Sequence, residues 1–138
     1  MTKTEILEFL NANPICYLAT SENNRPHVRA LGMVRADDRG LIFQTVAGKD
    51  FPNQLKENPV VEVCFYSREN NLQVRVQGKA ALVDDPELRE EIIEKRPFLK
   101  PWIEKNGIEG ILVFRVMDCQ ALVWTMALNF APKEYIRI

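Results

Sequence analysis

The sequence is short of the residues that build metal sites and nucleophilic catalytic centres. It has one histidine, His27, and three widely spaced cysteines, Cys16, Cys64 and Cys119, with no C-x-x-C pair. It also contains no G-x-G-x-x-G, P-loop or H-E-x-x-H motif. We therefore expect no metal centre and interpret the cysteines as free thiols buried in the core. No catalytic residue can be assigned, so if the chain is an enzyme, a cofactor carries the chemistry.

A strong net charge and long apolar runs are also missing. The 18 basic and 19 acidic residues leave a formal net charge of -1, which argues against nucleic-acid or anionic membrane partners. No apolar run approaches the length of a membrane span, and the first ten residues resemble neither a signal nor a transit peptide. We expect a cytoplasmic protein whose 138 residues form one domain, 1–138.

The apolar pattern predicts a mainly β chain with flanking helices. Strands are expected at residues 15–20, 26–35, 41–46, 60–66, 72–83, 111–117 and 121–126, and helices at 2–10, 50–58, 85–96 and 99–106. Most links between strands are too short for parallel crossovers, so the sheet is expected to be antiparallel and to curl into a barrel. Gly78 is expected to mark a bulge or bend, and residues 118–120 a tight turn. The tail from Leu128 is left unassigned.

The second predicted strand has two chemically different faces. Arg29 and Leu31 lie on one face by the two-residue period, and Val28 and Ala30 lie on the other. We expect the small apolar residues to face the core, which leaves Arg29 in a different environment.

Three polar residues near the third strand suit a phosphate. Arg29 and Lys49 are cationic donors, Thr45 offers a hydroxyl, and Lys49 directly precedes a predicted helix whose free N–H groups favour anions. The competing interpretation is that Arg29 and Lys49 are ordinary surface charges. Both interpretations remain open on composition and spacing alone.

Amide and aromatic side chains suit a heterocycle. Gln44 and Gln73 can pair with a ring edge, and Trp124 can cover a ring face. Glutamines on a sheet face and a tryptophan in a strand are also commonly structural, so each signal is weak alone.

Four segments, taken in order, resemble the pyridoxamine 5'-phosphate oxidase-like family of FMN-binding split barrels. They are residues 25–32 (RPHVRALG), 43–45 (FQT), 49–63 (KDFPNQLKENPVVEV) and 72–80 (LQVRVQGKA). The resemblance implies a six- to seven-stranded antiparallel split β-barrel that forms a homodimer and binds FMN in grooves between the subunits. It implies cofactor contacts at Arg29, Ala30, Leu31, Gly32, Gln44, Thr45, Lys49, Gln54, Gln73 and Trp124, with Gln73 coming from the neighbouring subunit.

Departures from the family pattern bear on the substrate. The oxidases carry a C-terminal Arg-Leu-His-type motif, which residues 133–138 lack. The segment around Lys49 contains one basic residue, where the oxidases usually have two. Arg96 echoes a substrate-phosphate arginine, although its expected neighbours are replaced. We therefore interpret the chain as an FMN-dependent oxidoreductase for an unidentified small molecule, not a true pyridoxamine phosphate oxidase.

Two alternatives use the same barrel. One is a reductase that uses a deazaflavin or acts on a nitroaromatic substrate. The other is a non-catalytic binding protein for flavin, heme or another planar ligand, with His27 as the candidate heme ligand.

Overall fold

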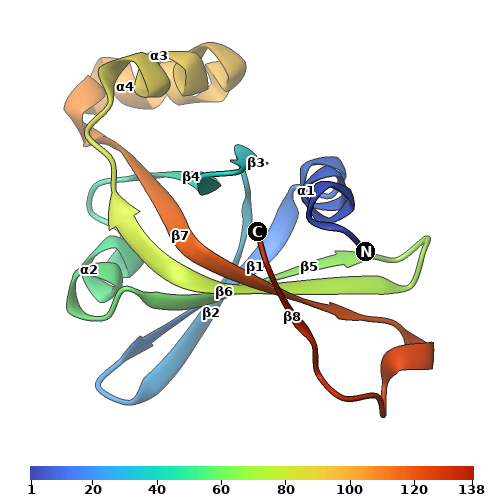
Figure 1. The fold of residues 1–138 in the computed structure, drawn as a ribbon. Helices are drawn as coiled ribbons and strands as arrows, with labels where there is room; N and C mark the ends of the chain where they lie inside the picture. The colour runs from blue at the N-terminus through green and yellow to red at the C-terminus, as the bar shows by residue number, and fades with distance from the viewer.

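The computed structural model describes residues 1–138 as a strongly curved antiparallel sheet with helices at its periphery (Figure 1). The strands are β1 Ile15–Glu22, β2 Arg25–Gly32, β3 Arg35–Asp37, β4 Gly40–Val46, β5 Val60–Ser67, β6 Leu72–Leu82, β7 Ile111–Trp124 and β8 Tyr135–Arg137. The helices are α1 Lys3–Ala12, α2 Asp50–Glu57, α3 Pro86–Lys95 and α4 Lys100–Asn106. The predicted fold class, an antiparallel β structure with flanking helices, is confirmed.

The sheet rolls up because β2 and β3, which follow each other in the chain, lie at its two opposite edges. The strand order is β2-β1-β5-β6-β7-β4-β3, with β8 paired to β7. Only Met33 and Val34 separate β2 from β3, and their N–H groups donate to the carbonyls of Pro14 and Ile42, at 2.8 and 2.9 Å. The prediction of one strand over residues 26–35 is therefore wrong at its end, because the chain leaves one sheet edge at Gly32 and joins the other at Arg35.

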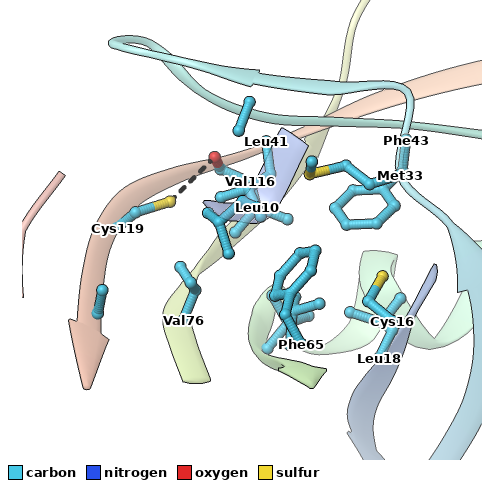
Figure 2. Close-up of a cluster of buried hydrophobic side chains, with 14 of the residues drawn as sticks. Leu10, Cys16, Leu18, Met33, Leu41, Phe43, Phe65, Val76, Val116 and Cys119 are labelled. Atoms are coloured by element: carbon cyan, nitrogen blue, oxygen red, sulfur yellow. Dashed lines mark hydrogen bonds between the residues drawn. The ribbon is translucent and has the colours of Figure 1, made fainter. Parts of the chain in front are cut away.

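The interior of the barrel holds a dense apolar core (Figure 2). Phe43 stacks on Phe114 with ring centroids 5.3 Å apart. All three cysteines are free thiols, and Cys16 and Cys119 are buried as predicted, whereas Cys64 is only partly buried. Burial raises the pKa of Cys16 to about 12 and that of Cys119 to about 11, so both remain protonated at neutral pH.

The long strand β7 corrects a second prediction. The turn expected at residues 118–120 is absent, and β7 runs unbroken for 14 residues. Its register against β6 shifts between Gln77 and Lys79, so that Asp118 and Cys119 lie opposite Gly78 alone. Asp118 takes a positive φ of 54°, as the extra residue of a β-bulge can. The bulge expected at Gly78 is confirmed. The extra residue of the bulge lies on β7, and the polar residues there suggested a turn in the sequence.

The helix ends follow the sequence closely. Thr2 and Glu5 form a reciprocal capping box at α1, and the Asp85 side chain caps α3 ahead of Pro86. Leu88, Ile92 and Leu99 bury themselves against β4 and β7 in a second apolar cluster, which holds α3 and α4 together at one end of the molecule (Figure 1). None of the helices has the length and apolar character needed to cross a membrane.

Candidate ligand-binding site

A hollow of about 580 Å³ lies where β2, the end of β4 and the start of α2 meet. Its walls are formed by His27, Val28, Arg29, Ala30, Leu31, Gln44, Thr45, Gly48, Lys49, Asp50, Phe51 and Gln54. Seven of the ten sequence-predicted cofactor residues are among them, namely Arg29, Ala30, Leu31, Gln44, Thr45, Lys49 and Gln54. The fold thus brings together residues from three separate stretches of the chain. We refer to this hollow as the β2–β4–α2 pocket.

Pairing with β1 decides which face of β2 turns inward, and it reverses the predicted assignment. Leu18 of β1 is fully buried and lies opposite Arg29, and Cys16 lies opposite Leu31. Arg29 and Leu31 therefore point toward the interior, while Val28 is 71% exposed. The expectation that the Val28 face packs on the core is wrong, because the inner side of β2 offers polar partners that satisfy an arginine.

Those partners hold Arg29 in a fixed position. Its Nη1 donates to the Thr20 hydroxyl at 2.7 Å and to the Leu18 carbonyl at 3.3 Å, and its Nη2 donates to Gln54 Oε1 at 2.6 Å. The guanidinium also lies over the Phe51 ring, 5.2 Å from its centroid. Burial lowers the pKa of Arg29, and the nearby Asp50 carboxylate acts in the opposite direction. Most of the guanidinium's donors are thus already used within the protein.

The start of α2 offers donors that the chain does not use. Lys49 occupies the N-cap position, and no side chain caps the free N–H groups of the first turn. The Thr45 hydroxyl, in a residue only 3% exposed, has no hydrogen-bond partner in the protein. A buried unpaired hydroxyl is costly unless a ligand or water satisfies it. Together with the Lys49 ammonium, these groups suit the oxygens of a phosphate, and Asp50 is the one carboxylate among them.

Arg96 reaches the pocket wall from the end of α3. Its Nη1 donates to Gln44 Oε1 at 3.2 Å and its Nη2 to the Gly32 carbonyl at 2.9 Å. Burial lowers the pKa of this guanidinium. Gly32 itself is not among the lining residues, and its connection to the pocket runs through Arg96.

The chain does not bring Gln73 and Trp124 to this pocket. They lie opposite each other on β6 and β7. Trp124 Nε1 donates to Asn129 Oδ1 at 3.0 Å. The Trp124 side chain lines a separate cavity of about 260 Å³ under the C-terminal segment. A contact of Gln73 with a cofactor held by another subunit remains a prediction.

The sequence interpretation did not assign several residues of the site, among them Thr20, Asp50 and Phe51. Thr20 is the one polar member of the alternating buried set Cys16, Leu18 and Thr20 on β1, and that alternation was the available signal. Asp50 and Phe51 were assigned only to the start of a helix, and nothing local to them indicated that they face Arg29.

An open antiparallel barrel with a donor-lined pocket beside a helix start defines the class to which this chain belongs. Residues 2–112 match the family described as pyridoxamine 5'-phosphate oxidase, which covers most of the chain. The chain therefore belongs to the pyridoxamine 5'-phosphate oxidase family.

Curated relatives show more distant similarity over part of their length. A dihydrophenazinedicarboxylate synthase from Pseudomonas chlororaphis is 33% identical over 82 residues, which is 59% of this chain and 36% of the relative. A pyridoxine/pyridoxamine 5'-phosphate oxidase from Mycobacterium leprae is 35% identical over 80 residues, which is 58% of this chain and 36% of that protein. The matched part of the chain thus spans well under half the length of these relatives.

Solved structures match nearly the whole chain. A NimC/NimA family protein from Clostridium acetobutylicum superposes with a TM-score of 0.77 at 25% identity, covering 98% of this chain and 92% of that one. General Stress Protein 26 from Bacillus anthracis gives a TM-score of 0.74 at 18% identity and covers 100% of both chains. The second likeness is one of fold alone.

Proposed function

We propose that this protein binds FMN in the β2–β4–α2 pocket and acts as a flavin-dependent oxidoreductase on a small molecule. The observation that carries the proposal is the unpaired, buried Thr45 hydroxyl beside an uncapped helix start and Lys49. These groups match the phosphate and hydroxyl oxygens at one end of FMN.

The rest of the pocket suits the ring system. Gln44 and Gln54 provide amide groups, the strand residues Ala30 and Leu31 provide wall surface, and a cavity of about 580 Å³ has the size of a typical cofactor site. When bound, FMN would supply the hydride or electron transfer that the side chains of this chain are not equipped to perform. The protein's own contribution is then to bind the cofactor, orient it and keep one face open to substrate.

We further propose that the working form is a homodimer. The outward side of β1, β2 and β5 carries exposed apolar side chains, with Ile15 65%, Val28 71% and Val60 56% exposed, and the register places the Glu62–Arg75 ion pair on the same side. Tyr17 and Tyr66 share this outer face by the strand register. Several exposed apolar side chains on one sheet face favour a protein interface there. We call this surface the outer apolar face. Because the family resemblance implies cofactor sites between subunits, we propose that a second copy of the chain covers it.

The names of the relatives support small-molecule chemistry without identifying the substrate. The Pseudomonas chlororaphis protein is a dihydrophenazinedicarboxylate synthase and the Mycobacterium leprae protein a pyridoxine/pyridoxamine 5'-phosphate oxidase. This chain matches only about a third of either one, so neither substrate is assigned to it.

The first test combines a visible absorption spectrum, a fluorescence titration with FMN and gel filtration of the same sample. We expect flavin bands in the purified protein, or saturable FMN uptake with one site per chain, in a species of twice the chain mass. A riboflavin titration provides the matched comparison, because it lacks the phosphate that Thr45, Lys49 and the α2 N–H groups are proposed to hold. Equal affinity for the two ligands would contradict the phosphate assignment.

A second candidate function is non-catalytic binding of heme. The observation that favours it is that His27, the only histidine, lines the same pocket, with its Nε2 3.7 Å from a Glu22 carboxylate oxygen. The same titration series should therefore include hemin. Saturable heme binding with no uptake of FMN would replace the flavin proposal.

A further inference from the structure

Each glutamine in the pocket wall is held by an arginine. Gln54 Oε1 accepts from Arg29 Nη2 at 2.6 Å and from the Thr20 hydroxyl at 2.7 Å. Gln44 Oε1 accepts from Arg96 Nη1 at 3.2 Å. The two pairs come from different parts of the chain, one beside β1 and α2 and the other at the end of α3, yet they make the same contact.

The chemistry of arginine fixes the direction of both amides. A guanidinium has five N–H donors and no acceptor, so only the carbonyl oxygen of an amide can face it favourably. The amide N–H₂ groups of Gln44 and Gln54 must then point away from the arginines, and neither has a hydrogen-bond partner within the chain. Both glutamines line the pocket, so their free N–H₂ donors are available to a ligand.

Neither arginine forms an ion pair with a carboxylate. The ion pairs of the protein involve other cationic side chains, and Arg29 and Arg96 are in none of them. Arg96 instead places its two terminal nitrogens on two neutral oxygens, Gln44 Oε1 and the Gly32 carbonyl, while partly buried. Burying a charge costs free energy unless the charge is paired and hydrogen-bonded. For Arg96, these two hydrogen bonds to neutral oxygens supply the compensation.

We propose that Arg29 and Arg96 are positioning residues that turn the amides of Gln54 and Gln44 into fixed donors, so that the pocket recognises a ligand by its hydrogen-bond acceptors. This inference rests on the proposed function for the identity of the ligand but not for the orientation of the amides. The ring carbonyl oxygens and ring nitrogens of a flavin are acceptors of the required kind. A ligand that presents amino or hydroxyl donors to these two positions is selected against.

The substitutions Gln44→Glu and Gln54→Glu test the donor requirement. Each keeps the size and shape of the side chain and strengthens its contact with the arginine, but removes the N–H₂ donor. We expect about tenfold or greater loss of FMN affinity with no decrease in thermal stability. Asn24→Asp, in the exposed β1–β2 turn, adds the same charge elsewhere and serves as the matched control. Unchanged FMN affinity in both glutamate variants would overturn the proposal.

A double-mutant cycle separates positioning from direct contact. If Arg96 acts through Gln44, Arg96→Met weakens FMN binding about three- to tenfold in the wild-type background and has no further effect in Gln44→Ala. Arg96→Lys should restore little, because one ammonium does not reproduce the forked contact with Gln44 and Gly32. Fully additive losses would show that Arg96 touches the ligand itself, which would overturn its positioning role. Arg29 supports more of the core, so the Arg96 cycle is the cleaner of the two.

A measurement on the ligand-free protein makes the inference independent of FMN. The side-chain amide signal of Gln44, assigned by its loss in Gln44→Ala, should show restricted nanosecond motion by NMR relaxation in the wild type and free motion in Arg96→Met. Equal mobility in the two proteins would overturn the proposal. If the wild type ignores FMN while the Gln44 amide is rigid, the proposed function fails and the positioning role stands.

Discussion

Lys49 and Asp50 place opposite charges side by side at the start of α2, and both line the pocket. For the phosphate of the proposed FMN ligand, the ammonium would be attractive and the carboxylate repulsive, so the affinity of the site would depend on their balance. The carboxylate also interacts favourably with the α2 N-terminus and with Arg29, which accounts for its presence on physical grounds.

Substitutions at these two residues should change FMN affinity in opposite directions. Lys49→Ala should weaken binding by about tenfold, since it removes a charge-assisted contact, and Asp50→Asn should strengthen it by roughly two- to fivefold. Fluorescence titration at low and high salt measures both effects, which should shrink as salt screens the charges. Asp38→Asn, in the exposed turn before β4, is the control for net charge. Changes of the same sign in the two variants would contradict the proposed phosphate position.

Arg29 shows how one residue can serve the core and the site together. It was expected to lie apart from the core, but its guanidinium connects β1, β2 and α2 through Thr20, Leu18 and Gln54. Loss of Arg29 would therefore disturb the fold as well as the pocket, so Lys49 is the more informative of the two cationic positions for binding experiments.

At the scale of elements, the bulge between β6 and β7 depends on a glycine. A Cβ atom on Gly78 would lie 2.6 Å from Val116 Cγ1 and 2.7 Å from the Met117 carbonyl oxygen. Contacts this short require the backbone of β7 to move, because a carbonyl oxygen cannot rotate out of the way as a side chain can.

We expect Gly78→Ala to lower the free energy of unfolding by about 1–3 kcal/mol. Urea denaturation followed by circular dichroism measures the loss. Gly32→Ala is the matched control, because the nearest atoms to its Cβ are at the ordinary contact distances of 3.7 and 3.9 Å, so its effect should stay within about 1 kcal/mol. If the two alanine variants were equally stable, the close packing of β7 on Gly78 would not be a constraint in solution.

For the whole molecule, the outer apolar face links the proposed dimer to the proposed cofactor site. By the strand register, Gln73 lies on the same side of the sheet as Tyr17 and Tyr66, whereas Arg29 points to the inner side. One copy therefore does not bring Gln73 and Arg29 to the same pocket. The predicted contribution of Gln73 therefore needs a second copy, and we propose that this copy sits on the outer apolar face.

Tyr17→Asp should convert the proposed dimer to a monomer, because it places a charge in the middle of the outer apolar face on both copies. Sedimentation velocity measures the change, and FMN affinity should fall with it if the partner completes the site. Phe98→Asp, at a residue 69% exposed near α4 and away from this face, is the control and should leave the dimer intact. A Tyr17→Asp protein that remains dimeric would place the interface elsewhere.

The local structure of this protein and the kinds of chemical group it carries could be predicted from the sequence alone. Capping residues such as Thr2 and Asp85 act on neighbours three positions away, and alternation along a strand is a property of the strand alone, so both can be recognised without the fold. Seven pocket residues were also identifiable, through a resemblance that the family match over residues 2–112 confirms.

The tertiary structure decided which face of β2 turns inward and that β7 continues through Asp118, because both depend on pairing with distant strands. It also brought Arg96 to Gly32, 64 positions away in the chain, and so decided the direction of the Gln44 amide. Such contacts depend on how the sheet closes, and no local pattern in the sequence records them.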